Sequence, residues 1–296
     1  MKRLLFIVNP ISGGRDKGKF VEYVKYAFDS PDYECEMKFT EGVHHGYELA
    51  NSAKDSGDYD MLVAVGGDGS INDVVNAIVG SEIELGIVPM GSGNGLARHM
   101  DIPMDYHKSV EIILNGKVNK IDTFSITSEQ CKKPILATSL VGVGFDAHVA
   151  KKFAESTVRG FQTYAKIVVE DYVSYNPQTY KIIADNVKIT TQALFIAVAN
   201  SDRFGYNAVI APDASISDGI IDVSIVKKIP LYSILHFAYQ LFTRSILNSE
   251  YVDCVKAKEI KILDNVDEWV NVDGEPYKLG KDLSIIVNPN SLKVIR

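Results

Sequence analysis

The stretch Leu62-Val63-Ala64-Val65-Gly66-Gly67-Asp68-Gly69-Ser70-Ile71-Asn72 decides how the first half of the chain is interpreted. A short apolar, β-branched run leads into closely spaced glycines, and apolar residues then recur at helical spacing. This pattern predicts a buried strand, a tight turn and a helix. Glycines leave the backbone bare, so main-chain N–H groups and the helix N-terminus can approach an anion. The stretch therefore predicts a phosphate-binding turn.

The aspartate of this turn, Asp68, is unusual beside a phosphate, because a carboxylate repels such a ligand unless a cation lies between them. We therefore expect Asp68 to act through the Mg²⁺ that accompanies ATP. The alternative is an ordinary turn in which Asp68 or Ser70 caps the helix. The turn taken alone leaves both interpretations open.

Two more glycine-rich turns follow apolar runs nearby. Leu85 to Pro89 precedes Met90-Gly91-Ser92-Gly93-Asn94-Gly95, and Leu4 to Val8 precedes Asn9-Pro10-Ile11-Ser12-Gly13-Gly14. Up to about residue 115, apolar runs alternate with amphipathic segments, which predicts an open α/β domain with a parallel sheet. Turns at the carboxyl ends of parallel strands form the usual ligand site of such domains.

The second half of the chain has a different pattern. After Lys117, alternating and β-branched segments predict a mostly antiparallel β domain with helical insertions at 161–175 and 231–247. We expect the apolar stripe of 231–247 to be core rather than membrane-facing. The predicted strands are 118–127, 135–143, 180–184, 193–199, 221–226, 259–263 and 283–287.

Composition limits the classes of function. The chain has 296 residues, 46% of them hydrophobic, and a formal net charge of −7, which argues against sequence-independent binding of nucleic acid. Three widely spaced cysteines without metal-ligand spacing suit a reducing compartment. No apolar run approaches the roughly 18 residues of a membrane span. We expect a cytoplasmic protein whose membrane contact, if it has any, is local.

Further motifs follow these turns in a fixed order along nearly the whole chain. They are Thr40, G-S-G-N-G-L-A-R at 91–98, Ile121-Asp122, Gly144-Phe145-Asp146, Arg159-Gly160 with Tyr164, Ala211-Pro212-Asp213-Ala214, Ser217-Asp218-Gly219 and Val272-Asp273-Gly274-Glu275. The series resembles the diacylglycerol and sphingosine kinase family, and within it the bacterial lipid kinases related to diacylglycerol kinase. A single G-G-D-G is also found in NAD kinases and phosphofructokinases, so the ordered series is the more specific signal.

The resemblance implies an N-terminal α/β domain like that of NAD kinases and phosphofructokinases, followed by a β-sandwich-like domain. On it we expect 1–124 to form the nucleotide-binding domain, with 290–296 returning to it, and 125–289 to carry substrate and metal. The implied activity is transfer of the γ-phosphate of ATP to the hydroxyl of diacylglycerol or a related lipid. The implied nucleotide-binding residues are Asn9, Thr40, Gly66, Gly67, Asp68, Gly69, Ser70, Ile71, Asn72 and Ser92.

The resemblance also assigns two catalytic carboxylates in the second domain, in addition to Asp68 in the first. A lipid hydroxyl is a poor nucleophile, and a carboxylate that accepts its proton assists phosphoryl transfer. Asp273 resembles the family's proton acceptor, and Glu275 resembles a supporting acidic partner. Without the resemblance, Asp273-Gly274 is better interpreted as a hairpin turn.

A structural Mg²⁺ site is implied by the resemblance alone. It would use Ser215, Asp218 and Ile220, with Asp122 linked through water. Hard oxygen ligands of this kind suit Mg²⁺. Taken alone, Asp218-Gly219 would be a turn.

Two departures from the family pattern leave the lipid unspecified. Gly95 stands where many bacterial members carry aspartate, and 204–207 is poorer in glycine than the family pattern. The expected partners are a lipid substrate and a transient membrane contact at the inner face, and a homodimer stays open. The alternatives are a soluble-substrate kinase of the NAD kinase type and a nucleotide-binding regulator without catalysis.

Overall fold

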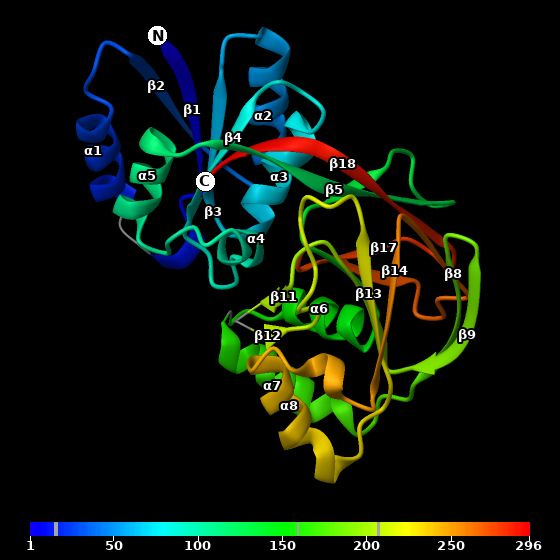
Figure 1. The fold of residues 1–296 in the computed structure, drawn as a ribbon. Coiled ribbons are helices and arrows are strands. Elements are labelled where there is room, and N and C mark those ends of the chain that lie inside the picture. The colour runs from blue at the N-terminus through cyan, green and yellow to red at the C-terminus, as the bar shows by residue number, and fades with distance from the viewer. Residues whose placement is uncertain (15–16, 159, 206–207) are drawn as a thin grey trace. The chain divides into compact units, whose positions relative to one another are not determined.

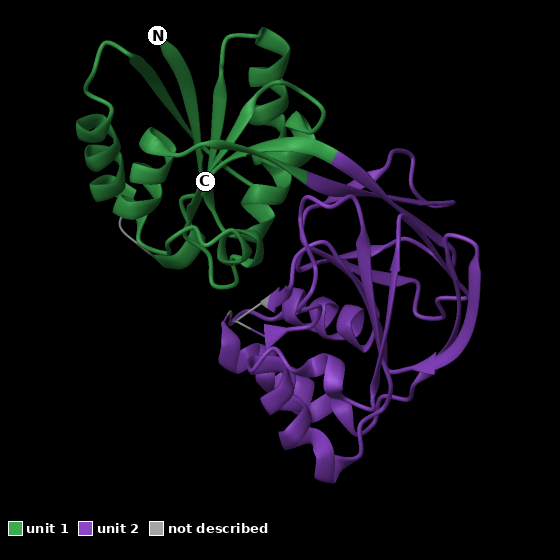
Figure 2. Cartoon of the chain, in the orientation of Figure 1, with its two compact units in different colours: residues 1–121, 290–296 green, residues 122–289 purple. Residues whose placement is uncertain are grey.

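The structure is a computed structural model that describes residues 1–14, 17–158, 160–205 and 208–296 (Figure 1). The motif residue Arg159 and part of the stretch 204–207 lie outside the described residues. The chain divides into two compact units, Met1–Ile121 with Asn290–Arg296, and Asp122–Pro289 (Figure 2). Two strands, β5 (Val118–Ser128) and β18 (Leu283–Ile295), carry the chain from one unit to the other.

The first unit is built on a parallel sheet in the order β2-β1-β3-β4. Its strands are β1 (Lys2–Val8), β2 (Tyr33–Phe39), β3 (Met61–Gly66) and β4 (Glu84–Pro89), and its helices are α1 (Lys17–Ala27), α2 (His45–Ser56), α3 (Asp68–Ile78), α4 (Gly95–His99) and α5 (Tyr106–Asn115), with a 3₁₀ turn η1 (Ser12–Gly14). Every residue of β3 is buried, as expected for a central strand covered on both faces. The predicted open α/β architecture is confirmed.

Alternate residues of the central strands face different helix layers. Leu4, Phe6 and Val8 of β1 pack in one cluster with Val63 of β3, together with residues of α1 and α5. Figure 1 shows α1 and α5 on one side of this sheet and α2 and α3 on the other. This is the period of two expected for strands with apolar side chains on both faces.

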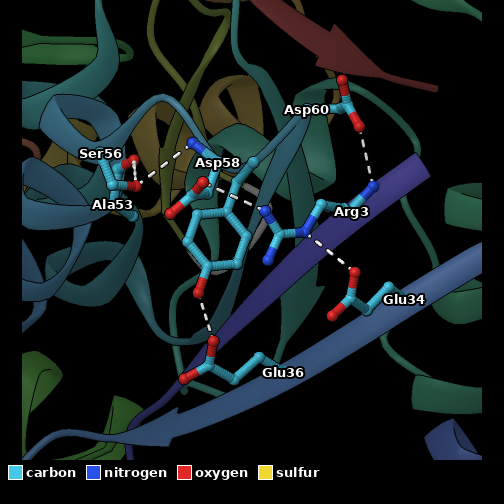
Figure 3. A network of polar contacts seen from close by, with 8 residues as sticks. Arg3, Glu34, Glu36, Ala53, Ser56, Asp58 and Asp60 are labelled. Atoms are coloured by element: carbon cyan, nitrogen blue, oxygen red, sulfur yellow. Dashed lines mark hydrogen bonds and ion pairs between the residues drawn. The ribbon is translucent and has the colours of Figure 1, made fainter. Parts of the chain in front are cut away.

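Polar contacts fasten the amino ends of these strands (Figure 3). Arg3 of β1 pairs through Nε with Glu34 of β2 at 3.0 Å and through Nη1 with Asp58 at 3.2 Å. The main-chain N–H of Arg3 donates to Asp60 at 2.8 Å. The carboxyl ends at the opposite edge carry the glycine-rich turns instead.

The last strand of the chain returns to the first unit. In β18, Lys293 and Val294 pair in parallel with Glu84 and Leu85 of β4. These residues lie in the segment 290–296, which we expect from the sequence to return to the first domain. The predicted strand 283–287 continues without a break into this segment.

The second unit is a sandwich of two sheets. One sheet has the order β14-β13-β10-β7-β16-β17, and in the other β18 is followed by β15, β8 and β9. Side chains of both sheets form one core, with Val143 and Ile196 from the first and Ile182 and Ile260 from the second. The strands are β6 (Ile135–Ala137), β7 (Leu140–Gly144), β8 (Gln178–Ala184), β9 (Val187–Ala193), β10 (Phe195–Ala199), β11 (Arg203–Gly205), β12 (Ala208–Val209), β13 (Ile221–Val226), β14 (Val252–Ala257), β15 (Glu259–Leu263), β16 (Trp269–Val272) and β17 (Glu275–Lys278).

The sequence prediction missed some strands of this unit, among them β9 and β14, and three further features also differ from it. The predicted strand 135–143 is two strands, β6 and β7, separated at Thr138 and Ser139. A helix that was not predicted, α6 (Phe145–Glu155), begins directly after β7 at Gly144, whose φ is 80°. The only turn signal here is this glycine, and an isolated glycine in an apolar run is more simply interpreted as part of a strand.

The third difference concerns the apolar stripe of 231–247. This segment forms a 3₁₀ turn η2 (Leu231–Ser233), the helix α8 (Ile234–Phe242) and a 3₁₀ turn η3 (Ile246–Asn248). The other predicted insertion, 161–175, forms the helix α7 (Phe161–Tyr172). Ile234 and Leu241 pack against the core, but Leu235 is 84% and Phe242 52% exposed. The prediction that this stripe is core is therefore confirmed for Ile234 and Leu241 and wrong for Leu235 and Phe242. No helix in the described part of the chain is long and apolar enough to cross a bilayer.

Candidate functional site

The carboxyl ends of the strands in the first unit bring its glycine-rich turns together. The N–H of Asn9, just after β1, donates to Val65 of β3 at 2.9 Å. The N–H of Met90, just after β4, donates to Gly66 at 2.7 Å. At the edge of the sheet, the N–H of Thr40 donates to Val8 at 2.9 Å. The ladders thus continue one residue beyond the strands and fix where each turn begins.

Two close approaches between these turns require glycine. A Cβ on Gly91 would lie 2.4 Å from the Cα of Gly67. A Cβ on Gly13, whose φ is 64°, would lie 2.0 Å from the carbonyl oxygen of Met90. Real Cβ contacts are not this short, and neither obstacle is a side chain that could turn away. The turns after β1, β3 and β4 therefore contact one another through bare backbone.

Asp68 joins two of these turns. Its Oδ2 accepts the N–H of Asn94 and its Oδ1 accepts the N–H of Gly95, both at 2.7 Å. Its own helix α3 begins after Gly67 without a side-chain cap. The alternative interpretation of the turn, in which Asp68 or Ser70 caps this helix, is therefore wrong, because Gly67 occupies the N-cap position. Asp68 instead satisfies the first N–H groups of α4, which would otherwise lack acceptors.

Asn94 is a residue of this turn that the sequence did not single out as functional. It is 2% exposed and has a left-handed φ of 57°. Its side chain closes the turn on Gly91, with Oδ1 accepting the N–H at 3.0 Å and Nδ2 donating to the carbonyl at 2.8 Å. Asparagine tolerates this backbone conformation better than most residues. Its presence between two glycines was therefore the sequence signal that could have identified it.

The other predicted nucleotide-binding residues lie at different depths. Nδ2 of Asn9 donates to Oγ of Ser70 at 3.3 Å, so these two side chains meet. Ser92 is exposed at the tip of its turn, and Thr40 is half-buried. Ile71 is 2% exposed and gives its N–H to Gly67 inside α3. Asn72 is also buried, and its carbonyl and Oδ1 both accept Nδ2 of Asn76 at 2.8 Å.

In the second unit, Asp273 and Gly274 form the two-residue turn between β16 and β17. Both have positive φ, 49° and 93°, and Val272 pairs with Glu275 across the turn. Asp-Gly pairs favour this kind of hairpin because both central residues need left-handed backbone. The hairpin interpretation of the sequence is therefore confirmed, and it does not exclude a chemical role. Glu275 is exposed at the start of β17.

The Asp273 carboxylate is held by the loop that separates β6 from β7. Oδ2 accepts the N–H of Thr138 at 2.7 Å and its hydroxyl at 3.1 Å. Oδ1 accepts the N–H of Ser139 at 2.9 Å and of Leu140 at 2.8 Å. All four partners are donors, an arrangement that suits an ionised carboxylate. The sequence did not identify this loop, because more than 130 residues separate it from Asp273.

Asn200 connects this loop to Asp122. Its side chain is fully buried, and Nδ2 donates to the carbonyl oxygens of Asp122 at 2.9 Å and Thr138 at 2.8 Å. Its N–H donates to Ser139 at 2.9 Å. Asn200 was not among the predicted site residues. A lone asparagine after an apolar run carries no signal that could have identified it.

The predicted metal ligands Ser215, Asp218 and Ile220 lie in the loop between β12 and β13. Oδ2 of the buried Asp122 accepts the N–H of Gly219 at 2.7 Å, which brings Asp122 to this loop. Asp218 is exposed, and its Oδ1 accepts the N–H of Ile220 at 3.0 Å. The described residues include no group of three or more His, Cys, Asp or Glu placed to hold a metal. A site here would depend on one direct carboxylate with carbonyl and water oxygens, which suits Mg²⁺.

Comparison with known proteins identifies both units. Residues 3–126 match the model described as diacylglycerol kinase catalytic domain. Residues 139–296 match the model described as YegS C-terminal NAD kinase beta sandwich-like domain. The chain belongs to the diacylglycerol kinase family. The predicted family, the two-part fold and the lipid kinase class of enzyme are confirmed.

Related proteins cover most of the chain. It is 28% identical over 282 residues to a diacylglycerol kinase of Bacillus subtilis (strain 168), covering 93% of this chain and 90% of that protein. It is 27% identical to a diacylglycerol kinase of Staphylococcus epidermidis (strain ATCC 12228 / FDA PCI 1200), covering 93% and 86%. A crystal structure of a diacylglycerol kinase from Bacillus anthracis str. Sterne aligns with a TM-score of 0.74 at 19% identity, covering 99% of this chain and 96% of that one. At this identity the structure supports the fold alone.

For Asp68 we expect that Asp68→Ala lowers the free energy of unfolding by about 1–3 kcal/mol, because the N–H groups of Asn94 and Gly95 lose their acceptor. Thermal unfolding of the nucleotide-free protein measures this. Asp60→Ala is the matched control, since it also removes an acceptor of one main-chain N–H but at the exposed opposite edge of the sheet. Equal, small losses in the two variants would contradict the structural role of Asp68.

Proposed function

We propose that this chain transfers the γ-phosphate of ATP to the hydroxyl of a lipid alcohol, diacylglycerol or a related lipid. Membership of the diacylglycerol kinase family carries the proposal. Two local observations support it. The first unit collects three glycine-rich turns at one edge of its sheet, and the second unit holds the carboxylate of Asp273 in a fixed position.

The proposed nucleotide site is the carboxyl edge of the first sheet. Bare main-chain N–H groups near α3, with the positive end of that helix, favour a bound anion such as a phosphate. Asn9, Thr40 and Ser92 add polar side chains on three neighbouring turns. In this proposal Asp68 acts on ATP mainly by fixing the turn after β4. Its second role would be a contact with the Mg²⁺ that accompanies ATP.

Asp273 is the proposed proton acceptor. In the reaction, the lipid oxygen forms a bond to the γ-phosphorus, the bond to ADP breaks and the hydroxyl proton passes to a base. The four bonds accepted by Asp273 use the acceptor capacity of a carboxylate, so one must be released first. The Thr138 hydroxyl can rotate away, whereas the three N–H groups are fixed in the backbone. Glu275, two residues further on, is the proposed acidic partner.

We also propose that Mg²⁺ supports the enzyme, both with ATP and at the loop of Asp218. The structural ion would be held by Asp218 and the carbonyl oxygens of Ser215 and Ile220, with Asp122 through water. When bound, Mg²⁺ would neutralise nearby negative charge and tie this loop together.

Membrane contact is proposed for the exposed side of η2 and α8. Within α8 the exposed side chains recur at spacings of four and three residues, which places them on one face, and two more lie in the preceding turn η2. Together they are Leu231, Tyr232, Leu235, Tyr239 and Phe242, each more than half exposed. An enzyme that takes its acceptor from a bilayer needs reversible contact with the membrane, and exposed aromatic and aliphatic side chains on a helix provide it.

The main test supplies labelled ATP and Mg²⁺ with alternative acceptors: diacylglycerol in vesicles, a sphingoid base and NAD. We expect the label to appear in diacylglycerol or another lipid. In Asp273→Asn we expect the rate of transfer to fall by about 10²–10⁴-fold. Label only in NAD would support an NAD-type kinase, and ATP binding without transfer would support a regulator.

The control for this variant is Asp185→Asn. Asp185 also opens a two-residue hairpin, has a φ of 50° and accepts two main-chain N–H groups at 3.0 Å. At Asp185 one oxygen, Oδ1, accepts both N–H groups, so an asparagine can keep both bonds through its carbonyl oxygen and the hairpin is preserved. Transfer that falls equally in the two, or in neither, would remove Asp273 from the reaction.

For the metal we expect Mg²⁺ to raise the melting temperature of the nucleotide-free protein, because an ion that binds only the folded state stabilises it. Asp218→Ala should lose this response, while Asp213→Ala, an exposed neighbour, should keep it. Differential scanning calorimetry with and without Mg²⁺ measures the difference. The same Mg²⁺ response in all three proteins would show that Asp218 is not a ligand.

For membrane contact we expect Leu235→Glu with Tyr239→Glu to reduce binding to phosphatidylcholine vesicles containing diacylglycerol by about tenfold or more, because two apolar side chains no longer leave water. Vesicle sedimentation measures the bound fraction. Val187→Glu changes an apolar residue of similar nature, 59% exposed on β9, and should have no effect. An equal reduction in both variants would mean that charge alone, and not this face, controls binding.

A further inference from the structure

A carboxyl group is buried in the second unit at the start of α6. Asp146 is 3% exposed, and its Oδ1 has no hydrogen-bond partner in the described part of the chain. Burial raises the pKa of Asp146 to about 7, although a hydrogen bond from Asn271 acts in the opposite direction. A buried polar atom without a partner costs free energy. Such a group calls for an explanation other than stability.

The surroundings of Asp146 are shaped to admit it. Gly142 of β7 lies under the carboxylate, and a Cβ at this position would be 1.7 Å from Oδ2. Gly142 pairs with Asn271 of the neighbouring strand β16. Nδ2 of Asn271, a residue that is 6% exposed, donates to Oδ2 of Asp146 at 2.8 Å. Gly142, Asp146 and Asn271 thus form one buried polar cluster.

This cluster leads directly to the turn of Asp273. Oδ1 of Asn271 accepts the N–H of Gly274, the second residue of that turn, at 2.9 Å. An asparagine side chain has one carbonyl oxygen and one amino group, so a bond that fixes Nδ2 on Asp146 also directs Oδ1 to Gly274. Without Asp146, the Asn271 amide could rotate and release the turn.

We propose that Asp146 is a positioning residue that acts through Asn271 on the Asp273–Gly274 turn and so sets the place of the Asp273 carboxylate. The inference rests on the proposed role of Asp273 in phosphoryl transfer. The loop 138–140 holds the Asp273 side chain from one direction, and the Asp146–Asn271 pair holds the following N–H from another. Two independent anchors fix the turn better than either alone.

The test compares Asp146→Ala, Asn271→Ala and the conservative Asp146→Asn in the full chain. Amide exchange of Gly274, followed by NMR without substrate, reports the turn directly. We expect exchange about tenfold faster in both alanine variants, because one hydrogen bond is lost. We also expect kcat to fall about tenfold while KM for ATP stays within about twofold, since the nucleotide site is not involved.

Asp146→Asn should retain the protection of Gly274, because its carbonyl oxygen can still accept Nδ2 of Asn271. The double alanine variant should be no worse than either single one, since both act through the same bond. Asn265→Ala is the matched control. Asn265 is fully buried at the other end of β16, where Nδ2 donates to Trp269 at 3.2 Å, so its loss should lower stability without changing Gly274 exchange.

A Gly274 amide that stays protected in Asp146→Ala overturns the inference. Unchanged kcat in a variant whose Gly274 amide has lost protection also overturns it. Failure of the proposed function is recognised by other results. They are a transfer rate of Asp273→Asn equal to that of the wild type, or no transfer to lipid by the wild type. Gly274 exchange requires neither ATP nor lipid, so the two failures are distinguishable.

Discussion

Main-chain N–H groups next to a strand end or in the first turn of a helix lack a partner in the regular structure and need another acceptor. In the candidate sites of both units, aspartate side chains are these acceptors. Asp68 accepts two such groups from the turn after β4, and Asp273 accepts three from the loop before β7. In each case a carboxylate from one turn fixes another turn that is distant in sequence. The geometry of the turns therefore depends on these two side chains.

Glycine is the complementary constraint in the first unit. Gly67 and Gly91 approach so closely that no side chain fits between them, and Gly13 lies against Met90 in the same way. A turn held at such distances cannot shift without breaking the bonds of Asp68. Bare backbone and a bridging carboxylate together produce a rigid concentration of main-chain groups at one edge of the sheet, which suits a polyanionic ligand.

The sequence predicted the helices and strands of the fold better than the contacts between them. Strands such as β3 and β13 were predictable because their apolar runs are bounded by turn residues. The helix α6 was not, because it follows β7 without a polar linker. The stripe of α8 shows the limit of periodicity. Leu241 and Leu235 belong to the same apolar pattern, yet Leu241 packs on the core and Leu235 is exposed. Only tertiary packing determines which of the two is buried.

The same distinction applies to the candidate sites. Local rules predicted the hairpin at Asp273 and Gly274, and the family motifs singled out Asp68, Asp122 and Asp218. Neither could identify Thr138 or Asn200, whose importance comes entirely from which strand ends are neighbours. A sequence without strand order cannot provide that information.

Strand order explains why these polar residues meet. In the second unit β10, β7 and β16 are adjacent, with Ala199 opposite Leu140 and Val272 opposite Val141. The end of β10, the beginning of β7 and the end of β16 therefore lie at one end of the sheet. The residues just beyond these strand ends are Asn200, the pair Thr138 and Ser139, and the turn of Asp273. Antiparallel pairing alone thus brings together three polar segments that the sequence separates.

This arrangement also removes the apparent conflict between a structural and a chemical interpretation of Asp273. A hairpin requires only that residues 273 and 274 adopt left-handed backbone, which Asp and Gly do at low cost. It does not require the buried amide of Asn271 or the loop donors around the carboxylate. Those contacts cost desolvation of polar groups in an otherwise apolar sandwich. Because a simple turn such as Asp185 at the end of β8 is formed with fewer of them, the additional contacts at Asp273 are better explained by a requirement to hold its carboxylate in one position.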